Sequence, residues 1–133
     1  MNNITLHRGD LPADFDLGPV VAVDTEAMGL NPARDALCVV QLSSGDGSAH
    51  VVQLGRDYDC PNLKALLGDE KTLKLFHFAR FDVAMIRKWM DVDCAPVWCT
   101  KIASKLARTY TDQHGLKHVA KKLPALTCRR LSK

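Results

Sequence analysis

The chain has 133 residues and a formal net charge of +3, with 47% hydrophobic and 25% charged residues. This composition is that of an ordinary soluble globular protein, and the length is typical of one domain. No apolar run is long enough for a membrane span, so an integral membrane protein is not expected. The five cysteines are scattered without a Cys-x-x-Cys pair. We therefore expect a reducing, cytoplasmic location.

The first predicted element is a strand over residues 20–25, an apolar run that leads into an Asp-x-Glu pair. Because side chains alternate along a strand, Asp24 and Glu26 are expected on the same side. Neighbouring carboxylates repel each other and are costly to bury, and a cation between them removes that cost. Carboxylate oxygens suit Mg²⁺ and Mn²⁺. The alternative is that Thr25 and Glu26 leave the strand into solvent while Asp24 caps a turn.

Further strands are predicted over residues 37–43 and 50–54, joined by a glycine-rich hairpin connection. A short helix over 61–67 has proline in its first turn, which is a favoured position for proline. A strand over 73–77 follows. Hairpin-connected strands followed by alternating helices and strands predict an α/β protein with a mixed sheet flanked by helices.

A helix is predicted from Phe78 onward because apolar residues recur there at helical spacing. They are Phe78, Phe81, Met85 and Trp89. Asp82 lies in the first turns of this helix, where the positive end of the helix dipole favours an acid. Asp82 is therefore either a functional acid or an ordinary first-turn acid.

The last predicted elements are a short edge strand at 96–99 and helices over 100–109 and 116–123. Three basic residues of the helix over 100–109 are spaced so that they share one face, namely Lys101, Lys105 and Arg108. Such a stripe suits a phosphate backbone. A solvated helix face is the alternative interpretation.

Two of these segments together resemble the motifs of DEDD-type 3′–5′ exonucleases. Asp24-x-Glu26 is similar to their first motif, and His77-x-x-x-Phe81-Asp82 is similar to their second, in which Asn is more common than His at the first position. Longer stretches resemble the ribonuclease D-like members called nano-RNase C: residues 7–12, 23–30, 37–47, 99–106 and 108–117. The resemblance extends from about His7 to Leu123 and implies a ribonuclease H-like exonuclease fold.

One motif of the family is not matched. Its third motif, Tyr-x-x-x-Asp, supplies a fourth metal-site acid and a water-orienting tyrosine. Neither Tyr58 nor Tyr110 has Asp four positions later. We expect a partial exonuclease domain over residues 1–123, incomplete at its C-terminus, and a divergent tail over 124–133. A truncation or frame change explains this pattern, and a naturally shorter variant is the alternative.

The resemblance implies hydrolysis of short single-stranded RNA, down to dinucleotides, to mononucleotides with two divalent ions, Mg²⁺ or Mn²⁺. Asp24, Glu26 and Asp82 correspond to the catalytic, metal-binding acids, and intact family members are expected to be homo-oligomers. The substrate contacts that we assign are Thr25, Met28, Gly29, Leu30, His77, Phe81, Lys101, Lys105 and Arg108. Leu30 would wedge between the terminal bases, and His77 would contact the terminal sugar. Core packing is the alternative for Met28, Leu30 and Phe81, and a partly buried histidine at a strand end is the alternative for His77. The competing function is an inactive nuclease fragment with a nucleic-acid-binding or assembly role.

Overall fold

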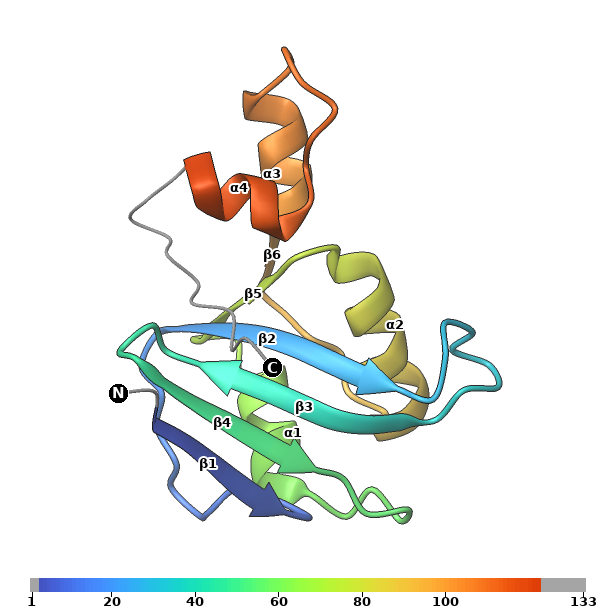
Figure 1. Cartoon of the computed structure of the whole chain (residues 1–133). Coiled ribbons are helices and arrows are strands. Elements are labelled where there is room, and N and C mark those ends of the chain that lie inside the picture. The colour runs from blue at the N-terminus through green and yellow to red at the C-terminus, as the bar shows by residue number, and fades with distance from the viewer. Residues whose placement is uncertain (1–2, 123–133) are drawn as a thin grey trace.

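A computed structural model describes residues 3–122 of the chain, which form six strands and four helices (Figure 1). In chain order they are β1 (Asn3–Arg8), β2 (Val20–Ala27), β3 (Leu37–Ser43), β4 (Ser48–Gln53), α1 (Pro61–Gly68), β5 (Leu73–Phe76), α2 (Ala79–Met90), β6 (Val97–Cys99), α3 (Thr100–Ala107) and α4 (Leu116–Lys122). Each strand and helix predicted from the sequence is present, with boundaries shifted by no more than two residues. The predicted tail over 124–133 lies outside the described residues.

The strands form one mixed sheet in the order β1-β4-β3-β2-β5-β6. The hairpin-connected strands β2, β3 and β4 pair antiparallel. The other three join in parallel, with β1 on β4, β5 on β2 and β6 on β5. The predicted mixed α/β sheet is therefore confirmed. Strand β1 was not predicted, because it lies at an edge of the sheet and buries too little of either face to show a clear alternation.

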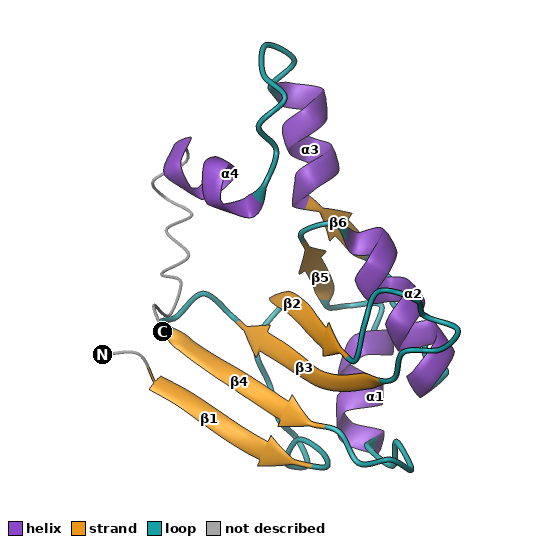
Figure 2. Cartoon of the chain, turned by 45° about the vertical axis from the view of Figure 1, so that its right-hand side comes forward, coloured by secondary structure: helices purple, strands orange, loops and turns teal. Residues whose placement is uncertain are grey.

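Helices α1 and α2 pack on one face of the sheet and enclose the hydrophobic core (Figures 1 and 2). The core side of β2 carries Val21 and Val23, which are 0% and 5% exposed. Val20 on the opposite side is 40% exposed. The strand predicted as a buried apolar run is thus buried on one face only, as is common where neighbouring strands are antiparallel.

Asp10, from the connection between β1 and β2, fixes the start of α1. Its carboxylate accepts hydrogen bonds from the backbone N–H groups of Asn62 at 3.0 Å and Leu63 at 2.8 Å. The residue at the N-cap position, Cys60, makes no such side-chain bond. Asp10 therefore satisfies the free N–H groups of the first helical turn from a distant part of the chain.

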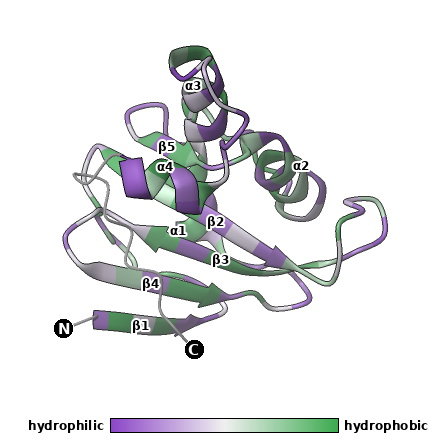
Figure 3. Cartoon of the chain, turned by 45° about the horizontal axis from the view of Figure 1, so that its top comes forward, coloured by the Kyte–Doolittle hydropathy of each residue, from purple (hydrophilic) through white to green (hydrophobic). Residues whose placement is uncertain are grey.

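Helices α3 and α4 lie beyond β5 and β6, away from α1 and the long strands (Figures 1 and 2). Apolar side chains on this side of the molecule contact water, including Trp98, Ile102 and Leu106 at 55%, 57% and 76% exposure. Figure 3 shows hydrophobic and hydrophilic residues interleaved along α3. Across residues 3–122, no helix has the length and apolar character that crossing a membrane requires.

Candidate active site

The two acids of the Asp-x-Glu pair lie on the exposed face of β2 near its end. The strand continues to Ala27, so Thr25 and Glu26 do not leave it, and the alternative of a turn at this point is wrong. Asp24 and Glu26 are exposed, whereas Thr25 between them is 6% exposed on the core side. A register shift between Glu26 and Ala27 in the pairing with β3 interrupts the regular ladder beside the acids. Such irregularities re-aim side chains next to functional sites.

Asp82 reaches the same strand from the first turns of α2. It is 4% exposed, and its Oδ1 accepts hydrogen bonds from the Thr25 hydroxyl at 2.5 Å and the Thr25 backbone N–H at 3.2 Å. This N–H is available because the pairing of β2 with β5 ends at Ala22. Asp82 therefore occupies the free edge of β2 and is tied to the residue between the two exposed acids.

Burial and charge both act on Asp82. Burial is the largest cause that raises the pKa of Asp82, hydrogen bonds from Thr25 oppose it and the charge of Asp24 adds to it, and together these effects raise the pKa to about 6. Asp24 and Asp82 thus repel each other in a partly dry environment, which a cation would relieve. No three His, Cys, Asp or Glu residues within 3–122 lie close enough together to hold a metal ion. The carboxylate oxygens of Asp24, Glu26 and Asp82 suit a hard divalent ion, but the three side chains do not converge on one point.

His77 directly follows strand β5, within electrostatic reach of Asp24. Its Nδ1 is hydrogen-bonded to the Thr100 hydroxyl at 2.9 Å, and its buried Nε2 has no hydrogen-bond partner among the described residues. The pKa of His77 is lowered, mainly by burial and also by the positive charge of Lys101. The backbone of His114 and the negative charge of Asp24 act in the opposite direction. The ring therefore offers a free nitrogen within electrostatic reach of Asp24.

The connection after β2 carries two of the predicted substrate contacts on the surface. Met28 and Leu30 are 76% and 85% exposed, so the core-packing alternative for Leu30 is wrong. Gly29 between them lies against the Asp35 carboxylate, with no room for a side chain. Phe81 is half-buried and packs against the core, as its alternative interpretation held.

The three predicted basic contacts are not on one helix face. Lys101 places Nζ 4.5 Å from the centre of the Phe78 ring, and Lys105 is exposed. Arg108 lies beyond the end of α3, is 9% exposed, and donates from Nη1 to the Ser104 hydroxyl and the Gln113 carbonyl. The expected stripe is therefore wrong at Arg108, because the helix ends at Ala107 and the guanidinium turns inward.

Phe78 is a candidate site residue that the sequence analysis missed. It was assigned to the apolar stripe of α2, but it precedes that helix in the left-handed conformation, with φ of 71°, and is 49% exposed. The Lys101 ammonium lies over its ring. An exposed aromatic ring paired with a cation is a suitable platform for a nucleobase. No sequence signal distinguishes this phenylalanine from the helical stripe that follows it.

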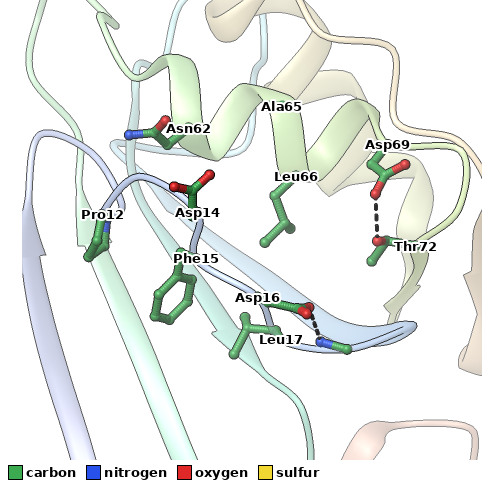
Figure 4. Close-up of a pocket in the computed structure, with 11 residues that line it drawn as sticks. Pro12, Asp14, Phe15, Asp16, Leu17, Asn62, Ala65, Leu66, Asp69 and Thr72 are labelled. Atoms are coloured by element: carbon green, nitrogen blue, oxygen red, sulfur yellow. Dashed lines mark hydrogen bonds between the residues drawn. The ribbon is translucent and has the colours of Figure 1, made fainter.

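A concavity of about 730 Å³ opens between the connection before β2 and helix α1, and it includes none of the predicted site residues (Figure 4). Two of its acids are engaged in local turns: Asp16 accepts from the Gly18 N–H at 2.7 Å, and Asp69 accepts from the Thr72 hydroxyl at 3.0 Å. Phe15 and Leu66 give it an apolar floor. This concavity is separate from the acids of β2.

Comparison with known proteins gives a consistent result. Residues 11–131 match the family described as 3′-5′ exonuclease. A ribonuclease D of Granulibacter bethesdensis is 32% identical over 97 residues, which are 73% of this chain and 24% of that protein. The chain thus spans about a quarter of the length of the curated relatives that it matches.

Two solved structures from Brucella melitensis are similar over nearly the whole chain. NrnC (nano-RNase C) with bound Mg²⁺ has a TM-score of 0.87 and 47% identity, covering 98% of this chain and 70% of that chain. NrnC bound to pGG has a TM-score of 0.90 and 48% identity, covering 100% and 66%. With the mixed sheet and the strand-end acids already in place, these matches establish that the chain belongs to the 3′-5′ exonuclease family.

Proposed function

We propose that this chain binds short single-stranded RNA at its 3′ end and releases mononucleotides, using divalent ions held by Asp24, Glu26 and Asp82. The observation that carries the proposal is the meeting of three acids at the end of β2: Asp82, 4% exposed, is hydrogen-bonded to Thr25, the residue between the exposed acids Asp24 and Glu26. A bound cation would relieve the repulsion between neighbouring carboxylates and keep them ionised at neutral pH. The Mg²⁺ and pGG bound in the two NrnC structures support a divalent ion and a short nucleotide substrate for this chain.

Each residue has a distinct task in this proposal. Asp24 and Glu26 bind from the exposed face of β2, and Thr25 orients Asp82 through its hydroxyl and backbone N–H. Divalent ions held by these acids would supply positive charge for activating water and stabilising the leaving oxygen. His77 lies beside the terminal sugar, and Lys101 and Lys105 attract the phosphate backbone. Met28 and Leu30 contact the bases, with Gly29 allowing the tight connection.

The expected activity is slow. The carboxylates are not gathered around one point, so ion binding requires their side chains to move closer together. The 133 residues also contain no Asp or Glu after Asp112 and no Tyr-x-x-x-Asp pattern. With fewer acids to hold them, a bound ion and the attacking water would be less well positioned, and small misplacements of reacting groups lower the rate by orders of magnitude.

The separation of the carboxylates also favours a second candidate function, in which the chain is a nuclease fragment that binds RNA without cleaving it. The two candidates differ in metal affinity at the acids. A Mn²⁺ titration followed by electron paramagnetic resonance should show binding to the wild type and about tenfold weaker binding to Asp24→Asn. Asp14→Asn, in the separate concavity, is the matched control and should bind as the wild type does. Equal binding by Asp24→Asn would contradict the proposed metal site.

A further inference from the structure

The connection between β2 and β3 carries Leu30, which is the most exposed large hydrophobic side chain among the described residues. Leu30 is 85% exposed and lies four positions after Glu26. An exposed leucine contributes little to the stability of this chain, since its apolar area stays in water. The backbone on both sides of Leu30 is nevertheless tightly held, and one carboxylate does most of the holding.

That carboxylate belongs to Asp35, which is 8% exposed. Its Oδ2 accepts from the Asn31 N–H at 2.9 Å, and its Oδ1 accepts from Arg34 Nε at 2.8 Å. The Asp35 N–H in turn donates to the Asn31 carbonyl at 2.7 Å. The residue after Leu30 is therefore fixed to Asp35 through both its N–H and its carbonyl.

The residue before Leu30 is fixed by the same group. A Cβ on Gly29 would collide with the Asp35 carboxylate, so the carboxylate packs directly on the Gly29 backbone. The base of the connection is closed by a hydrogen bond from the Met28 N–H to the Ala36 carbonyl at 2.9 Å. Its tip is tied to α2, where Trp89 Nε1 donates to the Pro32 carbonyl at 3.1 Å.

We propose that Asp35 is a positioning residue that holds Leu30 in place for contact with the bases of a short RNA; this role rests on the proposed function. Asp35 does not touch the RNA and acts only through the backbone on either side of Leu30. A contact group that is already ordered loses less conformational freedom on binding, so its affinity is higher. The predicted wedge therefore depends on a buried acid that the family motifs of this sequence do not include.

The test compares wild type, Leu30→Ala, Asp35→Ala and the double variant with a fluorescent 5′-phosphorylated GG dinucleotide in the presence of Mn²⁺. Each single variant should raise Kd and KM by about tenfold and leave kcat within about twofold, because the wedge contributes to binding rather than to the reacting atoms. The double variant should bind no more weakly than Leu30→Ala, since Asp35 acts through Leu30. Additive losses would overturn the proposal.

Asp46→Ala is the matched control for loss of stability. Asp46 braces the next hairpin connection in the same way, accepting from the Ser48 N–H at 2.8 Å and the Ser48 hydroxyl at 2.6 Å. The Asp46→Ala variant should leave Kd and KM unchanged. Gly29→Ala disturbs the Asp35 brace by collision and repeats the test if Asp35→Ala cannot be purified folded.

A second readout does not depend on RNA. The backbone amide order parameter of Leu30, measured by NMR, should be that of rigid backbone in the wild type and fall clearly in Asp35→Ala, but not in Asp46→Ala. An unchanged order parameter would overturn the proposal whatever the binding data show. A fall in the order parameter with no RNA binding by the wild type would instead contradict the proposed function and leave Asp35 as the brace of Leu30.

Discussion

Among single residues, Asp82 best shows the conflict between stability and function. It is nearly buried, lies near the like charge of Asp24, and accepts hydrogen bonds from the Thr25 hydroxyl and N–H. Such an arrangement is unfavourable for an isolated fold and is typical of functional sites. The stability of the metal-free chain should therefore be limited by this one carboxylate at neutral pH.

Replacing Asp82 with Asn should stabilise the metal-free chain at pH 8. The folded-state pKa is raised from 3.8 to about 6, so the stabilising contribution of this group is present below pH 3.8 and lost as the pH rises through 6. Asn keeps an acceptor for Thr25 and removes this loss, a gain of at most about 3 kcal/mol at pH 8 and none near pH 3.5. Urea unfolding at the two pH values measures it. A variant less stable than the wild type at pH 8 would contradict this account.

At the level of elements, the placement of α1 depends on a residue far away in the sequence. Asp10 binds two N–H groups of the first turn of α1, while Cys60 and Pro61 provide no side-chain acceptor there. This explains the structural value of the segment around Asp10, one of the stretches that resemble nano-RNase C. The helix in turn supplies Leu63 and Leu67, both fully buried, to the core.

Asp10→Ala should lower the free energy of unfolding by about 1–2 kcal/mol, the usual cost of losing a helix N-cap. Asp57→Ala is the matched control, because Asp57 precedes the same helix but bonds only to the Asp59 N–H at 3.2 Å. Chemical denaturation of both variants gives the comparison. If the two variants lose the same stability, Asp10 does not cap α1 in the way described.

Local patterns predicted most elements but not how they meet. The two-residue period of a strand was enough to place Asp24 and Glu26 on one side, and helical spacing was enough to find α2. The bond from Thr25 to Asp82 was not predictable, because it depends on where the pairing of β2 with β5 ends. The inward turn of Arg108 depends on the end of α3, which no glycine or proline marks in the sequence.

For the whole molecule, the uneven coverage of apolar side chains has consequences for association. Trp98, Ile102 and Leu106 follow one another at intervals of four residues and are all more than half exposed. Ile4 and Leu6 on β1 add apolar surface at the far edge of the sheet, at 43% and 54% exposure. Exposed apolar groups that gather in this way favour association with another surface.

The chain should therefore self-associate at micromolar concentration, and replacing Ile102 and Leu106 with Lys should reduce this association. Both positions are exposed, so lysine is tolerated there without loss of the core. Sedimentation velocity measures the distribution of species, with Lys117→Ala, on neighbouring α4, as a control that leaves the apolar side chains intact. A monomeric wild type would contradict the prediction.

The most direct test of the proposed function is hydrolysis of a 5′-labelled GG dinucleotide with Mn²⁺. The wild type should release mononucleotide slowly, about a hundredfold below a version extended by a Tyr-x-x-x-Asp motif, since that motif completes the ion and water positions. Asp24→Ala should abolish the release, and Asp14→Ala should not. No release by the wild type, or release that survives Asp24→Ala, would contradict the claim that the acids of β2 form the centre of a nuclease site.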